Sequence, residues 1–379
     1  MKSLQLSIAE ANAASADYSD LVALQPSLVL AFGSVKGIQA AAGSLVRAFP
    51  QAHLAGCSTA GEISRNGVDD GTLVVTGIHF DSVDVRQSTT QLAEMTDSRD
   101  AGIRLAQGLP RQGLRAVLVF GQGVQINGSA VIDGMVSVLG QSLPITGGLA
   151  GDGGAFAQTL VLDDGGVSND RLVAIGLYGD ALVFSHGSFG GWSPFGPARK
   201  VTRAVNNVLY ELDGEPALRI YKKYLGEHAK GLPASGLLFP FAMLGSDHSE
   251  IGLIRTILAV DEAAGSLTLA GEIDNDGYLK LMHANTDALV DGAESAARAA
   301  ADMHGRGPGG LALLVSCVGR KLVMGGRVDE EVEAVGDVFG SGATLAGFYS
   351  YGEISPFTKA VDCKLHNQTM TVTYIGEAG

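Results

Sequence analysis

Three glycine-rich turns in the sequence each place a carboxylate directly after a glycine. The pairs are Gly61-Glu62, Gly151-Asp152 and Gly352-Glu353, and each follows an apolar segment with the composition of a buried strand. In open α/β sheets, ligands bind beyond the carboxyl ends of the strands, where glycine allows close approach to the backbone and frees N–H groups. The three acids are therefore candidates for binding the ammonium group of a ligand.

Hydroxyl groups near these acids are candidates for binding the carboxylate of the same ligand. Ser58 and Thr59 precede the first acid, and Ser350 precedes the third. Each acid also has a purely structural interpretation, since an acid beside a glycine turn often caps the next element. Trp192 is a candidate for the wall of a pocket, with packing in a core as the alternative. The recurrence of glycine and acid favours a shared cleft.

Cys57 lies in the first of these turns and is a candidate nucleophile or ligand contact. No histidine is placed as an obvious base, and a small buried cysteine is the more common case. The sequence has no GxSxG elbow, no Walker loop, and no G-x-G-x-x-G register with an acid about 20 residues further on. An enzyme, such as a thiol-dependent hydrolase using Cys57, is therefore the least favoured hypothesis.

The eight histidines show no spacing typical of a zinc site. A single axial ligand to haem leaves no such spacing, so haem b is a candidate cofactor. His283 lies between a predicted strand and a predicted helix, and His366 begins another predicted strand. Either could ligate haem iron, or could simply bind a backbone group.

The elements that must position these residues recur along the chain. Apolar strand segments followed by helices begin the copies at Leu28–Gly33, Val117–Gly121 and Leu311–Ser316. Two β-rich segments, Thr72–Ser88 and Arg171–Ser188, also align and have a hairpin-like pattern. The sequence therefore predicts an α/β fold of internally duplicated strand–helix–strand units, in which helices cover mixed sheets.

The length of 379 residues predicts a two-domain or internally duplicated protein. The segment Ser188–Thr202 is rich in glycine, proline and aromatic residues and indicates an irregular connection. A helix is expected after Pro216, and a hairpin is expected around Ala264-Gly265. We place the boundary between residues 1–210 and 211–379.

The composition limits the partners and the compartment. The net charge is −14, which disfavours binding to nucleic acid or to anionic membrane surfaces. The apolar runs are too short for a membrane-spanning helix, and no signal peptide is expected. The three widely spaced cysteines, Cys57, Cys317 and Cys363, suit a reducing environment. A cytoplasmic protein is expected.

Several segments together resemble the FIST family (F-box and intracellular signal transduction). The similar segments cover both domains of the family, roughly from residue 20 to the end, and occur in the family's order: GCSTAGEI, SPFGPARKVTRAVNNVLYELDGEPALRIYKKYLG, LAGEIDNDGYLKLM, GFYSYGEISPF and HNQTMTV. On this resemblance, residues 1–210 correspond to the N-terminal FIST domain and residues 211–379 to the C-terminal domain.

The resemblance implies a sensory protein for a small ligand, an amino acid or a related metabolite. Bacterial members are often joined to histidine kinase or chemotaxis output domains, so this chain is expected to signal to a separate partner such as a histidine kinase. Free-standing members resemble haem-binding nitric oxide sensors that inhibit a kinase. The first hypothesis is therefore a sensor with a ligand cleft between the duplicated units, and the second is a haem-based nitric oxide sensor on the same scaffold.

Overall fold

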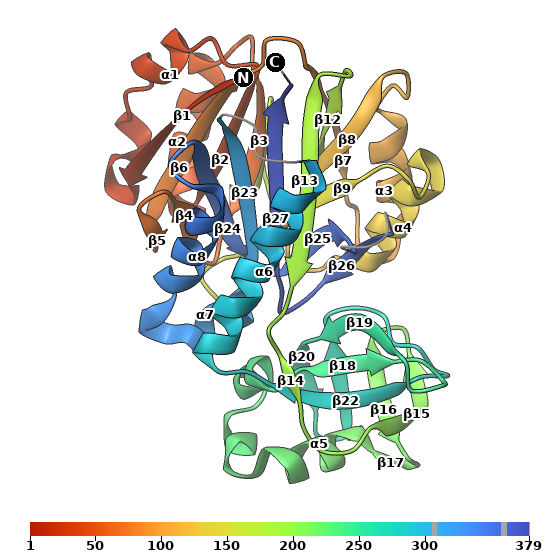
Figure 1. The fold of residues 1–379 in the computed structure, drawn as a ribbon. Coiled ribbons are helices and arrows are strands. Elements are labelled where there is room, and N and C mark those ends of the chain that lie inside the picture. The colour runs from red at the N-terminus through yellow and green to blue at the C-terminus, as the bar shows by residue number, and fades with distance from the viewer. Residues whose placement is uncertain (305–308, 358–361, 379) are drawn as a thin grey trace.

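Three six-stranded mixed sheets form an α/β core in the upper part of Figure 1, and a fourth sheet forms a smaller lower lobe. The computed structural model describes residues 1–304, 309–357 and 362–378. The first sheet has, in spatial order, β1 (Lys2–Ala9), β6 (Thr72–His79), β2 (Leu28–Gly33), β3 (His53–Ser58), β10 (Val161–Asp163) and β11 (Gly166–Ser168).

The other two core sheets follow the same plan. The second has β26 (Cys363–His366), β25 (Gly352–Pro356), β9 (Ile145–Leu149), β8 (Leu114–Gly121), β12 (Arg171–Tyr178) and β7 (Asp84–Gln91). The third has β13 (Leu182–Phe189), β27 (Met370–Glu377), β23 (Gly310–Cys317), β24 (Ala343–Ser350), β4 (Glu62–Ser64) and β5 (Gly67–Asp69). Each sheet has one parallel pair at its centre, namely β2–β3, β8–β9 or β23–β24. The predicted mixed sheets and repeated units are confirmed, and the units number three.

Each sheet is completed by a short hairpin from another unit. Hairpin β4–β5 follows β3 in the chain but pairs with β24 in the third sheet. Hairpin β10–β11 follows β9 but pairs with β3 in the first sheet. Hairpin β25–β26 follows β24 but pairs with β9 in the second sheet. The three units therefore exchange hairpins in a cycle.

The sequence pattern predicted a hairpin in Thr72–Ser88 and another in Arg171–Ser188. This predicted pairing is wrong. Strands β6 and β7 lie in different sheets, as do β12 and β13. Alternation along a strand indicates which face is buried but carries no information about which strand pairs with it. In this fold the connection between these strands passes from one unit to the next.

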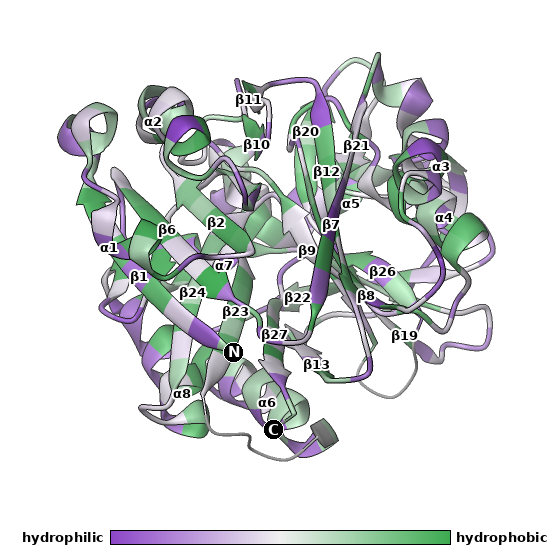
Figure 2. Ribbon diagram, turned by 90° about the horizontal axis from the view of Figure 1, so that it is seen from above, coloured by the Kyte–Doolittle hydropathy of each residue, from purple (hydrophilic) through white to green (hydrophobic). Residues whose placement is uncertain are grey.

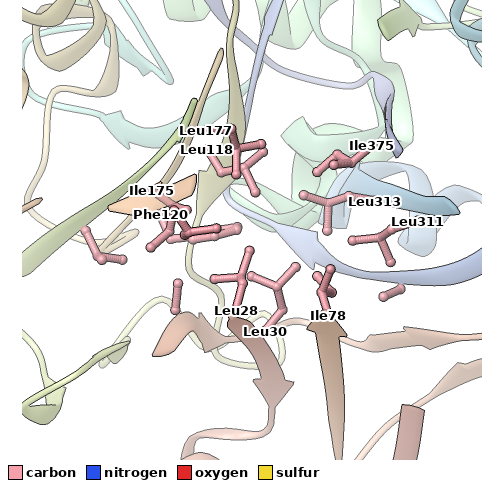
Figure 3. Packing of buried hydrophobic residues seen from close by; sticks show 14 of the residues in the cluster. Leu28, Leu30, Ile78, Leu118, Phe120, Ile175, Leu177, Leu311, Leu313 and Ile375 are labelled. Atoms are coloured by element: carbon pink, nitrogen blue, oxygen red, sulfur yellow. The ribbon is translucent and has the colours of Figure 1, made fainter. Parts of the chain in front are cut away.

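The inner faces of the three sheets enclose one common core (Figure 3). Figure 2 shows the core from above, with hydrophobic residues concentrated along its strands. Phe32, Phe120 and Phe348 come from three different sheets and meet at this centre. The rings of Phe32 and Phe348 stack with centroids 4.7 Å apart, and Phe120 lies 5.5 Å from Phe32. Burial of each ring contributes roughly 2–3 kcal/mol.

Helices cover the outer faces of the core sheets (Figure 1). The helices of the core are α1 (Ser19–Ala23), α2 (Val35–Ala48), α3 (Ser98–Gln107), α4 (Gly128–Leu139), α6 (Thr286–His304), α7 (Val318–Met324) and α8 (Asp329–Phe339). Short 3₁₀ helices occur at η1 (Glu10–Ser15), η2 (Met95–Asp97) and η5 (Gly325–Arg327). The first sheet packs on α2, the second on α3 and α4, and the third on α6 and α8.

The lower lobe is inserted between β13 and α6, both of which belong to the third unit. It contains β14 (Ser193–Pro194), β15 (Arg199–Val205), β16 (Val208–Leu212), β17 (Glu215–Pro216), α5 (Ala217–Leu225), η3 (Gly226–Gly231), η4 (Ala234–Leu238), β18 (Phe241–Leu244), β19 (Glu250–Arg255), β20 (Ile257–Asp261), β21 (Ser266–Leu269) and β22 (Tyr278–His283). The helix expected after Pro216 and the hairpin expected around Ala264-Gly265 are confirmed by α5 and by β20–β21. The boundary drawn between residues 210 and 211 lies inside β16.

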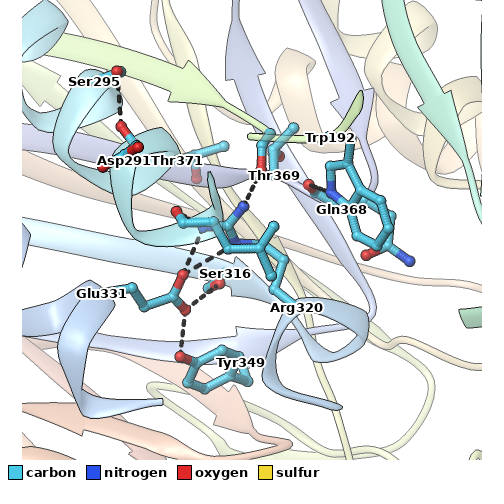
Figure 4. Close-up of polar contacts among 12 residues, drawn as sticks. Trp192, Asp291, Ser295, Ser316, Arg320, Glu331, Tyr349, Gln368, Thr369 and Thr371 are labelled. Atoms are coloured by element: carbon cyan, nitrogen blue, oxygen red, sulfur yellow. Dashed lines mark hydrogen bonds and ion pairs between the residues drawn. The ribbon is translucent and has the colours of Figure 1, made fainter. Parts of the chain in front are cut away.

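A buried ion pair of the core lies beside the chain crossings into the lower lobe (Figure 4). Arg320 on α7 and Glu331 on α8 are both fully buried, and their closest N–O distance is 2.6 Å. The Arg320 guanidinium also donates to the carbonyls of Gly190 and Leu289, which lie at the two chain crossings into the lobe. Glu331 accepts further hydrogen bonds from the hydroxyls of Ser316 and Tyr349. Every charged atom of the pair therefore has partners, as a buried ion pair requires.

The close approach of β23 and β24 gives a first prediction. A Cβ on Gly347 would lie 1.8 Å from the Leu314 carbonyl oxygen, whereas a Cβ on Gly326 would have nothing within 4 Å. Substitution Gly347→Ala should lower the free energy of unfolding by about 3 kcal/mol or more, because the backbone of the sheet must separate. Chemical denaturation measures this change. The control Gly326→Ala should stay within about 0.5 kcal/mol of the wild type, and equal stability of the two variants would contradict the register described here.

Candidate functional site

The turns that carry the predicted site residues meet at one end of the core. Three backbone hydrogen bonds join the turns of the three units in a cycle, from Gly151 N to Ser58 O at 2.8 Å, from Ala60 N to Tyr349 O at 2.8 Å, and from Tyr351 N to Leu149 O at 3.2 Å. Equivalent strand ends therefore lie together, because each hairpin crosses to another unit's sheet at this point.

Glu62 and Glu353 occupy equivalent positions with equivalent partners. Glu62 accepts hydrogen bonds from the Thr59 hydroxyl and from the N–H and hydroxyl of Thr72, the last two at 2.9 Å. Both carboxylates are nearly inaccessible, with exposed fractions of 2% for Glu62 and 0% for Glu353. Burial raises the pKa of Glu62, although these hydrogen bonds oppose the shift.

The Glu353 carboxylate repeats this arrangement atom for atom. It accepts from the Ser350 hydroxyl at 2.8 Å, and from the N–H and hydroxyl of Thr369 at 3.2 Å and 2.9 Å. Burial raises the pKa of Glu353 to about 7, against the effect of these three donors. The hydroxyls of Thr59 and Ser350 are thus occupied by carboxylates of the protein itself.

Asp152 does not occupy the third equivalent position. Phe348 on β24, Gly148 on β9 and Cys57 on β3 are equivalent positions in the three sheets. Phe348 pairs with Glu62 and Gly148 pairs with Glu353, whereas Cys57 pairs with Val161. The second unit therefore lacks the buried carboxylate, and Asp152 lies in the turn before β10. The pattern of glycine followed by an acid predicted that Asp152 is equivalent to Glu62 and Glu353. It is not, because Asp152 lies in a turn whereas the two glutamates lie in strands.

Asp152 instead organises its own turn. Its carboxylate accepts hydrogen bonds from the N–H groups of Phe156, Ala157 and Gln158 at 2.7–2.9 Å and from the hydroxyl of Tyr351. Burial disfavours ionisation of Asp152, but the hydrogen bonds from Tyr351 and the three N–H groups outweigh it and lower the pKa. Asp152 is therefore ionised at neutral pH.

A cleft of about 640 Å³ opens where the turns of the first two units meet α7. Its lining residues are Glu10, Ser34, Val35, Lys36, Thr59, Ala60, Gly61, Glu62, Asp70, Gly71, Asp152, Gly153, Val318, Lys321, Leu322 and Gly325. Of the predicted residues, Thr59, Glu62 and Asp152 line this cleft. Cys57, Ser58, Trp192, Ser350 and Glu353 do not belong to its lining. The volume is typical of a small-molecule site.

Lys321 is the cleft residue that the sequence pattern did not reveal. Its ammonium group donates to the Ala60 carbonyl at 2.9 Å, forms an ion pair with Asp70, and lies 5.5 Å from the centre of the Tyr349 ring. The Lys321 side chain is 18% exposed, whereas Asp70 is 72% exposed. A lysine within a short helix has no distinctive signal, because the fold alone brings α7 to the turn of the first unit.

Ser58 and Cys57 lie behind the cleft. The Ser58 hydroxyl donates to the Gly151 carbonyl at 2.7 Å and accepts from Leu160 N–H at 2.8 Å, so both of its hydrogen-bonding roles are used within the protein. Cys57 is fully buried in the common core, and burial raises the pKa of its thiol well above the usual value. A buried, protonated thiol is a poor nucleophile, and no cysteine in the described residues forms a disulfide.

Trp192 lies at the junction of the lobes and not in the cleft. Its indole N–H donates to the Gln368 carbonyl at 2.7 Å, and the Gln368 side chain donates to the Leu237 carbonyl at 2.9 Å (Figure 4). Trp192 therefore fixes the chain where it enters the lower lobe. Its neighbour Phe195 packs on the lobe core, edge-on to His283 with ring centroids 5.6 Å apart.

The two histidines differ in how well they would fit haem iron. His366 is buried, its Nε2 lies 2.9 Å from the Ser355 carbonyl, and burial lowers its pKa to about 4. That nitrogen is committed to the backbone, so His366 does not fit as an axial ligand in this arrangement. His283 is exposed at the end of β22, and neither histidine lines any of the cavities described.

Two further features of the described residues bear on the sequence hypotheses. Within residues 1–304, 309–357 and 362–378, no group of three or more histidine, cysteine or acidic side chains is placed to hold a metal ion. In the same part of the chain, no helix combines the length and apolar character needed to cross a membrane.

The paired carboxylates give a second prediction, on the pH dependence of stability. The pKa of Glu353 is about 7 in the folded protein and near 4.5 in the unfolded chain, so its stabilising protonation is complete below pH 4.5 and is lost as pH rises through 7. Substitution Glu353→Gln mimics the protonated form. The free energy of unfolding of the wild type, relative to this variant, should fall by roughly 2.5 kcal/mol between pH 5 and pH 8.

Denaturant titrations of both proteins at pH 5, 6, 7 and 8 measure this difference. Other titrating groups, including His366, are common to the two proteins and cancel. Parallel pH profiles would show that the hydrogen bonds from Ser350 and Thr369 keep Glu353 ionised throughout this range.

Comparisons with known proteins cover most of the chain. The model of the FIST N domain matches residues 27–215, and the model of the FIST C domain matches residues 217–356. An uncharacterized protein of Methanocaldococcus jannaschii is 38% identical over 98 residues, which are 25% of this chain and only 19% of that protein's length. The chain thus matches about a fifth of that relative.

Two solved structures are also similar in outline. Cyanuric acid hydrolase from A. caulinodans aligns over 100% of this chain and 99% of its own, with 10% identity and a TM-score of 0.37. A second cyanuric acid hydrolase structure aligns over 99% of each chain, with 11% identity and a TM-score of 0.36. The two matching domain models are those of a family associated with signal transduction and small-ligand sensing. The chain belongs to the FIST family and carries both of its domains.

Proposed function

We propose that this protein senses a small zwitterionic ligand, an amino acid or a close relative, in the cleft between the turns of the first two units and α7. The observation that carries the proposal is the charge pattern of the cleft. Asp152, Asp70, Glu10 and Glu62 contribute carboxylates, and Lys36 and Lys321 contribute ammonium groups, that of Lys321 next to the turn of the first unit. A ligand with one ammonium and one carboxylate group matches both signs.

Lys321 is the group best suited to bind the ligand carboxylate. Its ion pair with the largely exposed Asp70 is screened by solvent, so exchange of Asp70 for a ligand carboxylate costs little. Asp152 remains ionised and is held in place by four donors, which makes it a fixed negative charge for the ligand ammonium.

The position of Lys321 also supports a route from ligand to output. Lys321 follows Arg320 on α7, and Arg320 binds the carbonyls of Gly190 and Leu289 at the two crossings into the lower lobe. A ligand that moves α7 would change the pose of the lobe, by an amount limited by its differential affinity for the two poses. We infer that the change is detected by a separate signalling protein, such as a histidine kinase, in the cytoplasm.

The binding site gives a third prediction, tested by calorimetric titration with the common amino acids. One or more of them should bind the wild type, and Lys321→Met should weaken that binding about tenfold or more, because a charge-assisted hydrogen bond is lost. Glu62→Gln should also weaken it, by roughly threefold, because the cleft loses part of its negative potential.

Glu353→Gln is the matched control. It makes the same substitution at a carboxylate with the same hydrogen-bond partners, but Glu353 does not line the cleft. Ligand affinity should therefore stay at the wild-type value. Equal effects of the two glutamine variants, or unchanged binding in Lys321→Met, would contradict the cleft as the binding site.

A further inference from the structure

A second cavity lies between the two lobes, on the other side of the Asp152 turn. This interlobe pocket has a volume of about 250 Å³. Its lining residues are Met95, Gly123, Val124, Gln125, Ile126, Asn127, Gly128, Leu149, Phe156, Tyr351 and Leu365 from the core, and Asn207, Leu258, Thr268, Leu269, Ala270 and Gly271 from the lower lobe. None of these side chains is charged at neutral pH, so an ionic ligand would lose its hydration without compensation.

An aromatic pair forms one wall of the interlobe pocket. The rings of Phe156 and Tyr351 stack with centroids 4.1 Å apart and planes inclined by 15°. Phe156 is 38% exposed, and two further large apolar side chains of the pocket, Met95 and Leu258, are 45% and 42% exposed. Few large apolar side chains of the described residues are this exposed, and three of them converge on this pocket.

The backbone at Phe156 is held in an unfavourable conformation. Its φ angle is +53°, in the left-handed region that aromatic residues rarely adopt. Asp152 maintains it, because the Phe156 N–H donates to the Asp152 carboxylate at 2.8 Å. Such strain commonly accompanies ligand sites, where it presents a side chain that would otherwise pack away from solvent.

The same loop, residues 151–158, reaches both cavities. Asp152 lines the cleft, and Phe156 lines the interlobe pocket. Tyr351 holds the loop in place through three hydrogen bonds. Its hydroxyl donates to the Asp152 carboxylate and accepts from the N–H groups of Asp152 and Gly154 at 3.2 Å and 3.0 Å. A displacement of Asp152 therefore changes the position of the aromatic wall.

We propose that the interlobe pocket is a second ligand site, which takes a small uncharged aromatic molecule, and that the 151–158 loop couples this site to the cleft. An apolar cavity of about 150 Å³ is known to hold benzene, so this volume suits a two-ring molecule. The ligand ring stacks on the Phe156–Tyr351 pair and contacts Leu258 and Ala270 of the lower lobe. Because both lobes contribute walls, the bound ligand stabilises one relative pose of the lobes.

Indole is a suitable probe, with isothermal titration calorimetry on the full chain as the measurement. Indole should bind the wild type with a single saturable site, and Phe156→Ala should weaken binding about tenfold through loss of the stacked ring. Ala270→Phe should abolish binding by filling the pocket. Phe189→Ala is the matched control, since Phe189 is an exposed aromatic residue outside the pocket, and its affinity should equal that of the wild type.

Absence of saturable binding to the wild type, or full affinity in both Phe156→Ala and Ala270→Phe, would overturn the site. The outcome does not depend on the cleft ligand, because the titration contains no amino acid.

The coupling is tested by variants that keep both stacked aromatic rings of the pocket wall. Tyr351→Phe keeps the stacked ring and removes only the hydroxyl, and Asp152→Asn removes one acceptor oxygen of the loop. Each should weaken indole binding about fivefold, because the loop no longer holds Phe156 against Tyr351. Asp70→Asn, which changes a cleft acid with no bond to the loop, should leave the affinity unchanged. Wild-type affinity in both loop variants would overturn the coupling while leaving the second site intact.

Discussion

The pairing of each short hairpin with the sheet of another unit is the constraint on which this structure depends. A unit taken alone would leave one side of its parallel pair without a partner, and unpaired strand edges are costly and prone to association. The exchange of hairpins gives the parallel pair of each sheet a partner on that side, in one closed cycle. It also brings the three turns to the same end of the core. The three central phenylalanines, one from each sheet, meet inside this closed arrangement. The cleft exists because the exchange also carries the turns of two units to α7.

Repetition of the units explains why two carboxylates have the same chemistry and different surroundings. Glu62 and Glu353 are each held by a hydroxyl three residues earlier and by a threonine, which is the first residue of β6 for Glu62 and directly precedes β27 for Glu353. In the second unit Val161 occupies the corresponding position, and the turn before it holds Asp152 and Phe156 instead. The three points at which a hairpin joins the sheet of another unit therefore differ chemically. The second unit departs from the repeat in the loop that reaches both the cleft and the interlobe pocket.

The sequence allowed the repeated α/β units, the helices and the family to be predicted, because each depends on local periodicity or on contiguous motifs. Of the candidate residues it indicated, Thr59, Glu62 and Asp152 line the cleft. It could not show that β6 and β7 belong to different sheets, since strand alternation does not specify partners. The roles of Lys321 and Tyr351 could not be predicted for a related reason: they arise only when α7 and the turn after β24 approach segments that are far away in sequence. The equation of Asp152 with the two glutamates failed because a longer turn shifts the register of the second unit.

The Arg320–Glu331 pair has a consequence for the two chain crossings between the lobes. Both groups are removed from water, and separating them inside the protein would leave an uncompensated charge. Arg320 also binds the carbonyls of Gly190, directly after β13, and Leu289, in α6, so it fixes the core side of both chain crossings. One guanidinium thus sets both the place where the chain leaves the core for the lobe and the place where it returns. Loss of the ion pair would loosen both crossings together.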